Sequence, residues 1–398
     1  RRVPAKNAAF TSQLAQRQRE PCLTAADREL WQRANVGAPE GRTQSRRLYT
    51  AVQHTRTPPQ RVEHKMPLTL YEAVATALLC ASCCSWILLD AASIHVLLGK
   101  ARLYASGFLL MFIGRDKRWR RKPPARSDVQ AQTATKTKKL LFLRHGESEW
   151  NLVFNKGPKP LIPFKLVAAL LRELRMLVAL DPGSVLFDSP LNMEGLEQAQ
   201  ELARALKGDA PLDGGDAADA EALRGGGSAV ICSSNMRRAL QTAAVAFQRP
   251  QPPPRIHVLS CLQEISTNVD TVALAAPGEA PLLPRVPPDL SFPKRFDASR
   301  NAGTKPLRGH GGERLKAFCD WAMARPEATI VVAGHSLWFQ SFFREYLPAE
   351  AEHDGKRFKV ANGGVVACVL ERGSVDFVRP ESIKAVHKGF DLKKKKVA

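Results

Sequence analysis

The stretch that most constrains the fold of this chain runs from Lys139 to Asn151 and reads KLLFLRHGESEWN. Its apolar beginning predicts a short buried strand, which ends abruptly at Arg144-His145-Gly146. Glycine at this point lets the backbone turn tightly and approach a ligand. Neutral imidazole is a competent nucleophile near neutral pH, and a guanidinium holds phosphoryl oxygens through a fork of donors. An Arg-His pair at a strand end therefore suits phosphoryl capture.

Short apolar runs alternate with longer amphipathic runs, and 398 residues with 44% hydrophobic composition can bury a sizeable core. Strands are expected at 139–143, 229–233, 255–259, 328–333 and 364–370, and helices at 163–180, 193–206, 236–247, 313–324 and 337–346. The stretches 208–227 and 275–309 are rich in small, acidic or Pro residues and are interpreted as loops. This alternation predicts an α/β layered fold with a largely parallel sheet.

The net charge of +21 is unevenly distributed. Residues 1–65 are Arg-rich and acid-poor without sustained apolar periodicity, so we expect a disordered, targeting or untranslated extension. The sequence does not begin with Met, which leaves open a missing start, initiation at Met66, or an organellar targeting segment. A basic linker is expected at 115–138 and a basic tail at 381–398. Such runs are typical of solvated tails and also suit anionic lipid or nucleic acid.

A hydrophobic segment at 66–114 is expected to contact a membrane. Its first apolar run, 73–98, is long enough to cross a hydrocarbon core, whereas the second run, 103–114, is too short to cross alone. Asp90 and His95 count against a simple span. Because a Lys/Arg-rich flank is usually retained on the cytoplasmic side, we expect a membrane-associated protein whose downstream domain faces the cytosol. The alternatives are a cleaved signal sequence, a buried helical pair and an organellar location.

The eight cysteines do not form a disulfide framework. Cys80, Cys83 and Cys84 lie in the first apolar run, where they suit small-residue packing better than palmitoylation. The others are scattered, which favours a reducing compartment, and no pair has zinc-ligand spacing with a matching second pair.

Five segments, in the same order, resemble the histidine phosphatase (phosphoglycerate mutase-like) superfamily, of the branch 1 type with an Arg-His-Gly motif. These segments are 141–151, 188–199, 231–243, 262–266 and 330–337. The resemblance implies a three-layer phosphoglycerate mutase-like fold over 139–380, with a largely parallel central sheet flanked by helices. In this chain the N-terminal hydrophobic helical segment would precede that domain.

The resemblance also implies which residues carry the chemistry. His145 would be the nucleophile, and Glu264 would protonate the leaving oxygen and then accept a proton from the attacking water. General acid work near neutral pH needs a raised pKa, which partial burial beside a dianionic phosphate would provide. Asp270 is the reserve candidate for the acid.

Five residues are expected to bind the phosphoryl group. By resemblance, Arg144, Arg238 and His335 form a positive pocket that also stabilises the transition state, so we count them among the catalytic residues. Asn151 matches a family position near the phosphate. Ser148 suits either a hydrogen bond to the phosphate or a helix cap. No metal or other cofactor is required, because these cationic side chains supply the charge that Mg²⁺ would otherwise supply.

Two neighbouring residues are interpreted from helix geometry. Asn192 stands where the family has threonine, and both residue types can cap a helix. Arg237 precedes Arg238 and lies about 100° round the helix from it, so it is expected to face solvent or the rim.

A phosphatase acting on a phosphomonoester is the favoured function. A phosphoglycerate mutase would show Glu-Arg-His-Tyr-Gly around the acid, where this chain has Gln263-Glu264-Ile265-Ser266-Thr267. The alternatives are a mutase-type phosphotransferase, or a catalytically silent phosphate-binding or membrane-tethered scaffold. The expected partner is a phosphorylated small molecule, lipid or phosphoprotein. Specific nucleic-acid binding is not expected, since only the net charge favours it.

Overall fold

The computed structural model describes residues 71–77, 91–209, 212–225, 229–249 and 252–392. The chain divides into two compact units, Arg1–Ala75 and Thr76–Ala398, and the second contains the fold described below. The predictions for residues 1–65, for residues 78–90 of the first apolar run with its three cysteines and Asp90, and for the lysines at 393–396 lie outside the described residues. The four described cysteines, Cys232, Cys261, Cys319 and Cys368, are free thiols.

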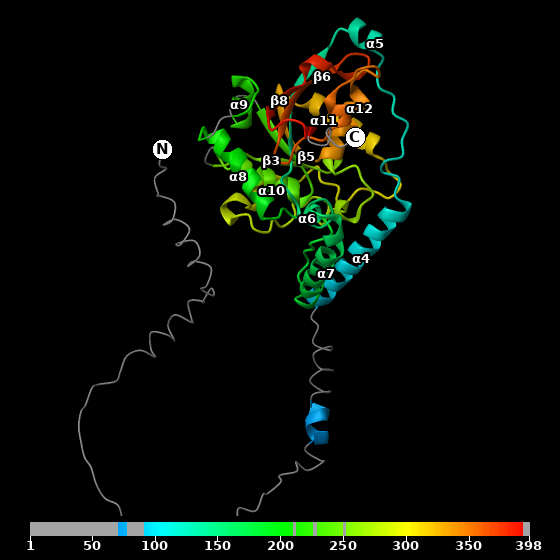
Figure 1. Cartoon of the computed structure of the whole chain (residues 1–398), viewed down its shortest axis with the longest axis vertical. Helices are drawn as coiled ribbons and strands as arrows, with labels where there is room; N and C mark the ends of the chain where they lie inside the picture. Colours follow the sequence, from blue (N-terminus) through cyan, green and yellow to red (C-terminus); the bar gives the residue numbers. More distant parts are fainter. Residues whose placement is uncertain (1–70, 78–90, 210–211, 226–228, 250–251, 393–398) are drawn as a thin grey trace, which may run out of the picture. The chain divides into compact units, whose positions relative to one another are not determined.

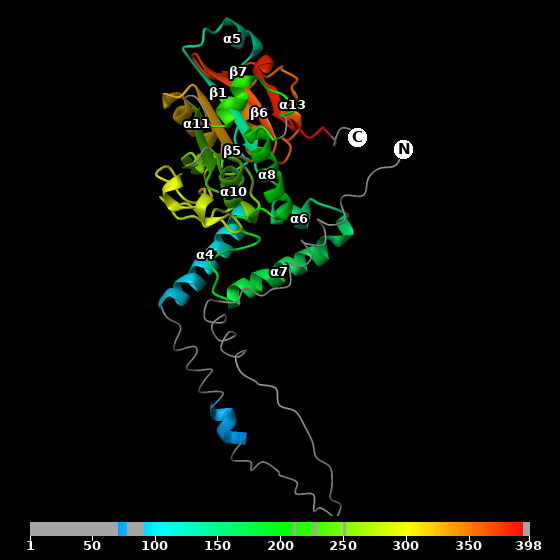
Figure 2. The same ribbon diagram turned by 90° about the vertical axis from the view of Figure 1, so that its left-hand side faces the viewer.

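A mixed eight-stranded sheet forms the centre of the second unit (Figures 1 and 2). Its strands are β1 (Lys136–Arg144), β2 (Ala229–Ser234), β3 (Ile256–Leu259), β4 (Phe296–Asp297), β5 (Thr329–Gly334), β6 (Val365–Arg372), β7 (Asp376–Val378) and β8 (Lys384–His387). The order is β4-β3-β2-β5-β1-β6-β7, with β8 paired to β6. The first five strands are mutually parallel and β6, β7 and β8 form antiparallel pairs, which confirms the largely parallel sheet.

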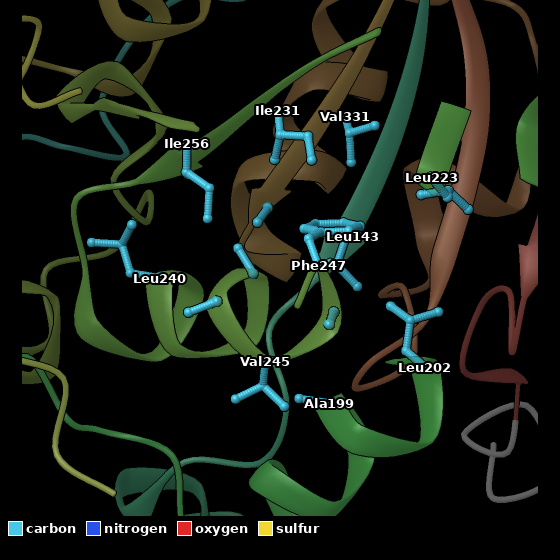
Figure 3. Close-up of a cluster of buried hydrophobic side chains, with 14 of the residues drawn as sticks. Leu143, Ala199, Leu202, Leu223, Ile231, Leu240, Val245, Phe247, Ile256 and Val331 are labelled. Carbon is cyan, nitrogen blue, oxygen red and sulfur yellow. The ribbon is translucent and has the colours of Figure 1, made fainter. Parts of the chain in front are cut away.

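Helices cover both faces of the sheet. The helices are α4 (Ala91–Ile113), α5 (Arg126–Ala131), α6 (Glu149–Phe154), α7 (Ile162–Val178), α8 (Met193–Lys207), α9 (Ala217–Leu223), α10 (Arg237–Ala246), α11 (Gly311–Ala324), α12 (Ser336–Tyr346) and α13 (Asp354–Arg357). Successive strand residues point to opposite faces, so Leu141 and Leu143 join a core with α8 and α10 (Figure 3). Leu140 and Phe142 join a second core with α11 and α12. The result is the predicted three-layer α/β architecture.

The folded region is longer than the predicted domain, 139–380. β1 begins at Lys136, and β8 pairs with β6 beyond Pro380, inside the expected basic tail. The expected basic linker is docked on the domain, because Asp116 is buried and the Gly311 amide donates to its carbonyl oxygen. Within 208–227, interpreted as a loop, Asp216 forms a capping box that starts α9.

Helix α4 joins the end of the first apolar run to the second run, which were predicted as separate segments. Among the described residues, Ser93–Ile113 is the one helical stretch long and apolar enough to cross a membrane. Helices α4 and α7 do not pack on a face of the sheet. They lie near each other at one end of the domain (Figures 1 and 2). We call α4 and α7 together the helix platform.

Candidate active site

The carboxyl ends of four parallel strands meet at one edge of the sheet, where ligands of α/β proteins commonly bind. A cavity of about 430 Å³ opens there, and we call it the strand-end cavity. It is lined by six of the seven predicted site residues, which are Arg144, His145, Ser148, Asn151, Arg238 and Glu264. The seventh, His335, is fully buried, and its ring centroid lies 5.1 Å from that of His145.

The hydrogen bonding of His145 determines which of its ring nitrogens is available. Its Nδ1 lies 2.6 Å from the carbonyl oxygen of Gly146. Since a carbonyl can only accept, Nδ1 carries the proton and Nε2 of the neutral ring keeps its lone pair. Burial lowers the pKa of His145 well below its ordinary value, and the charges of Arg238 and Arg144 lower it further. The ring is therefore neutral and nucleophilic at neutral pH.

Two buried guanidinium groups, those of Arg144 and Arg238, line the cavity beside His145. Arg238 donates from Nη1 to the carbonyl oxygen of Asp270 (3.1 Å), and its Nη2 lies 3.3 Å from the Asp270 carboxylate. Arg144 donates from Nη1 to the carbonyl oxygen of Val360 (2.7 Å), and its Nε has no partner among the described residues. The remaining N–H groups can bind an anion, because guanidinium presents more donors than these contacts use.

A carboxylate lies next to the two histidines. Glu264 follows β3, and its Oε1 accepts a hydrogen bond from the Trp338 amide in the first turn of α12 (3.0 Å). Its Oε2 lies 3.9 Å from Nδ1 of His335, whose Nε2 is 2.9 Å from the Ser234 hydroxyl. Burial lowers the pKa of His335 well below its ordinary value, with Arg238 as a further cause. This edge of the sheet thus brings together a neutral imidazole, a carboxyl group and guanidinium donors that can bind an anion.

At the turn after β1, the main chain approaches that of α8 so closely that glycine is required in both segments. A Cβ on Gly146 would overlap the backbone of Gly195, and a Cβ on Gly195 would overlap the backbone of Glu147. Beyond this turn Ser148 caps α6 by accepting a hydrogen bond from the Asn151 amide (3.3 Å). Of its two predicted roles, Ser148 fulfils that of a helix cap. Ser148 and Asn151 also border the cavity.

Comparison with family models gives the decisive match. Residues 216–382 match the histidine phosphatase superfamily (branch 1), and this range contains Arg238, Glu264 and His335. The domain belongs to that superfamily. A comparison with curated proteins gave no match.

Several solved phosphatases are similar to the histidine phosphatase domain. Alpha-ribazole phosphatase from Shigella flexneri is 15% identical, with 64% of this chain and 98% of that chain covered and a TM-score of 0.32. Phosphoserine phosphatase from Entamoeba histolytica is 18% identical, with 58% of this chain and 90% of that chain covered and a TM-score of 0.30. A mycobacterial glucosyl-3-phosphoglycerate phosphatase is 15% identical, with 63% of this chain and 99% of that chain covered and a TM-score of 0.32. Family membership rests on the family model.

The structure corrects the prediction for Arg237, which is buried and does not face solvent or the rim. Its guanidinium donates to the carbonyl oxygens of Asp188 (2.8 Å), Phe187 (3.0 Å) and Ser184. The loop 184–188 covers this side of α10. The prediction used only the 100° step between neighbouring helix residues, which carries no information about a loop packed on the helix. Arg237 thus holds the loop against the helix that carries Arg238. Asn192 caps α8 by accepting from the Gly195 amide (2.8 Å), as expected.

Sequence reasoning missed an ionic cluster behind Glu264 in the histidine phosphatase domain. Asp116 accepts hydrogen bonds from Lys305 (2.7 Å), Arg314 (2.7 Å) and the Ser266 amide (2.9 Å). Lys305 also donates to the carbonyl oxygen of Glu264 (2.6 Å). Burial lowers the pKa of Lys305 to about 8, whereas the two cations hold that of Asp116 below its ordinary value despite burial. The cluster fixes the backbone of the segment that carries Glu264.

Three of the site residues offer ligand atoms suited to a metal ion. Among the described residues, His145, Glu264 and His335 bring such atoms within 4.8 Å of one another. The charges of Arg144 and Arg238 act on this same position, since both lower the pKa values of the two histidines. Their positive field favours an anion there over a cation. A phosphoryl group therefore suits the position better than a metal.

Proposed function

We propose that the histidine phosphatase domain hydrolyses a phosphomonoester through a phosphohistidine intermediate on His145. The observation that carries this proposal is the hydrogen bond from His145 Nδ1 to the Gly146 carbonyl oxygen. It leaves Nε2 as the unprotonated nitrogen in a cavity bordered by two guanidinium groups and a carboxyl group. These are the parts that nucleophilic catalysis on phosphorus requires.

In the first step, Nε2 of His145 attacks phosphorus in line with the departing oxygen. The N–P bond forms as the P–O bond breaks, and Glu264 gives its proton to the leaving alkoxide. Arg144 and Arg238 stabilise the equatorial oxygens, each contributing about 3 kcal/mol to lowering the barrier. His335, neutral because of its lowered pKa, donates a hydrogen bond to the same oxygens.

In the second step, water attacks the phosphohistidine. Glu264, now ionised, accepts a proton from the water while the P–N bond breaks and His145 leaves as neutral imidazole. Inorganic phosphate is released and Glu264 ends protonated, ready for the next turnover. The substrate is assigned by class only, a phosphomonoester of a small molecule, lipid or protein. Asp270, the reserve acid, is paired with Arg238, and burial raises the pKa of its carboxyl to about 6. Glu264 is preferred because its carboxylate lies 3.9 Å from Nδ1 of His335.

The test measures phosphate release by the full-length chain on a panel of phosphoglycerates, inositol phosphates, phospholipid headgroup monoesters and phosphopeptides. His145→Ala is expected to lower kcat by at least about 1,000-fold, because it removes the nucleophile. His95→Ala is the matched control, since His95 is an exposed histidine on α4 and should leave the rate unchanged.

A rapid-quench experiment with radiolabelled substrate tests the intermediate. An alkali-stable, acid-labile phosphoenzyme should accumulate in the wild type and be absent from His145→Ala. Equal release by both proteins would contradict the mechanism. Transfer of the label to a second hydroxyl of the substrate without phosphate release would instead favour a mutase, and phosphate binding without turnover would favour a silent binding protein.

A further inference from the structure

The helix platform exposes an unusually apolar surface. α7 exposes Phe164, Val167, Leu170, Leu171, Leu174 and Val178, with Phe164 at 74% and Val178 at 77% exposure. α4 exposes Ile94, Leu98, Phe108, Leu109, Met111, Phe112 and Ile113. The two helices lie at the same end of the domain, away from the sheet (Figures 1 and 2). Scattered surface leucines need no explanation, but the exposed apolar residues of α7 recur every three or four positions and so share one helix face, which marks an interaction site.

The opposite side of α4 is docked on the domain. Leu103 and Leu110 are buried in a small core with Phe187, and Gly107 lies so close to Phe187 that a Cβ would overlap its ring. Lys100 is also buried and donates to the carbonyl oxygen of Gly183 (2.7 Å). These contacts occur on successive turns, so one side of α4 packs against the domain while most of its residues remain exposed. This docking favours a position of α4 along the domain surface over a position across a bilayer.

Buried polar contacts also tie α7 to the same loop. Glu173, buried on α7, accepts hydrogen bonds from the amides of Val185 (3.0 Å) and Leu186 (3.2 Å). Lys100 of α4 lies 4.0 Å from the Glu173 carboxylate. At its outer side, Arg172 of α7 pairs with Glu149 at the start of α6 (3.1 Å). The platform is therefore built onto the fold, with its apolar residues pointing away from it.

The charges around the platform are almost all positive. Residues 91–122 and 156–181, which contain both helices and their flanks, include thirteen Lys and Arg residues but three acids, Asp116, Glu173 and Asp181. Asp116 and Glu173 are buried, so Asp181 is the one exposed acid in these ranges. A surface that combines exposed apolar side chains with basic flanks complements the interface of an anionic bilayer, where apolar groups enter the acyl boundary and cations meet the headgroups.

We propose that the helix platform is a membrane-binding surface that lies in the plane of an anionic bilayer interface, with α4 seated on it and not spanning it. The apolar residues of α7 and of the exposed side of α4 insert into the headgroup and acyl boundary. Because Arg172 links α7 to Glu149, directly after the His145 turn, the strand-end cavity would sit close to the lipid surface. This surface is independent of the catalytic proposal and is tested without any substrate.

The first experiment is flotation of the full-length chain with phosphatidylserine–phosphatidylcholine vesicles and with phosphatidylcholine vesicles alone. The wild type should float with the anionic vesicles and several-fold less with the neutral ones. The double variant Phe164→Glu/Leu171→Glu should lose at least about tenfold in partitioning, because it replaces two inserted side chains by charges. Met193→Glu/Val375→Glu adds the same charge at exposed apolar positions outside the platform and should bind like the wild type.

Equal flotation of both double variants would overturn the proposal, since binding would then belong to residues outside α7. Absence of vesicle binding by a folded wild type would also overturn it. If that protein were instead a dimer dissociated by Phe164→Glu/Leu171→Glu, the platform would be an interface between two copies of the chain.

A second experiment measures insertion depth, with lipids brominated at shallow or deep acyl positions as quenchers. Phe164→Trp on α7 and Ala105→Trp near the middle of α4 add tryptophans at exposed positions, and the wild-type signal is subtracted. Shallow bromines should quench both new tryptophans more strongly than deep ones. Stronger deep quenching at position 105 would show that α4 spans the bilayer, and this result would contradict the in-plane orientation.

Discussion

In the strand-end cavity charged side chains are buried, whereas on the helix platform apolar side chains are exposed. Arg238 is 2% exposed and Glu264 6%, but Phe164 is 74% exposed. Burying a charge is costly unless it is paired, and the contacts of Arg238 with Asp270 supply a partner. Exposing an aromatic ring forgoes the stabilisation that the core of the same protein gains from burying one.

The difference separates two kinds of functional surface. The strand-end cavity is rigid before any ligand arrives, because its charged groups are held by backbone carbonyls and by the Asp116 cluster. The exposed apolar residues of the platform make few contacts within the protein. Substitutions there should therefore change binding to lipid and not the free energy of unfolding. Three comparisons test whether this division holds.

The largest effect is expected from the same substitution made in both regions. Phe342→Ala removes a fully buried ring from the core between the sheet and α12 and should lower the free energy of unfolding by about 3–5 kcal/mol. Phe164→Ala on α7 should change it by less than about 0.5 kcal/mol. Urea unfolding without vesicles measures both. A loss at Phe164 comparable to that at Phe342 would mean that α7 is covered in the free protein.

Asp116→Asn should have the next largest effect. It removes the charge that pairs with Lys305 and Arg314, and leaving the buried Lys305 and the partly buried Arg314 uncompensated costs about 3 kcal/mol of stability. We also expect kcat to fall, because Lys305 holds the Glu264 carbonyl oxygen. Asp128→Asn, at an exposed acid on α5, is the control and should change neither quantity. Unchanged unfolding in Asp116→Asn would show that the cluster does not stabilise this segment.

The smallest effect is a change in the titration of His145. Burial, Arg238 and Arg144 all lower its pKa, so the ring should remain neutral as the pH falls through the range where an exposed histidine gains its proton. Removing one of these charges with Arg238→Met should raise the pKa. NMR of histidine-labelled protein measures the midpoint, with the resonance assigned through His145→Gln. The midpoint of His257, which faces Asp297 and not Arg238, should stay unchanged.

The elements that carry the cavity could be predicted because their signals are local. An apolar run followed by Arg144-His145-Gly146, and another followed by Gly334-His335, each predict a strand end from a few adjacent residues. Parallel pairing then brings the two ends together, as the β1–β5 register shows. The three-layer fold followed from the same alternation of strands and helices.

What could not be predicted depends on contacts between distant parts of the chain. Asp116 stands alone in a basic run, and its partners Lys305 and Arg314 lie about two hundred residues later, so no local pattern links them. Arg237 was misplaced because the loop that covers it is irregular. β8 likewise forms because β6 offers it a pairing position in the sheet. The short run 384–387 alone does not show that such a position exists.

The two facing glycines, Gly146 and Gly195, set a limit on how the enzyme can be re-engineered. A Cβ on Gly146 would meet the main chain of Gly195 in α8, and a Cβ on Gly195 would meet that of Glu147. Because main-chain atoms block both positions, no second substitution can relieve a first one, and a combinatorial library should leave both codons untouched. Diversity belongs instead at exposed cavity-lining positions, such as Asn155, Lys156 and Asn268. Under the proposed mechanism, such a library would alter which alcohol leaves without disturbing the turn that orients His145.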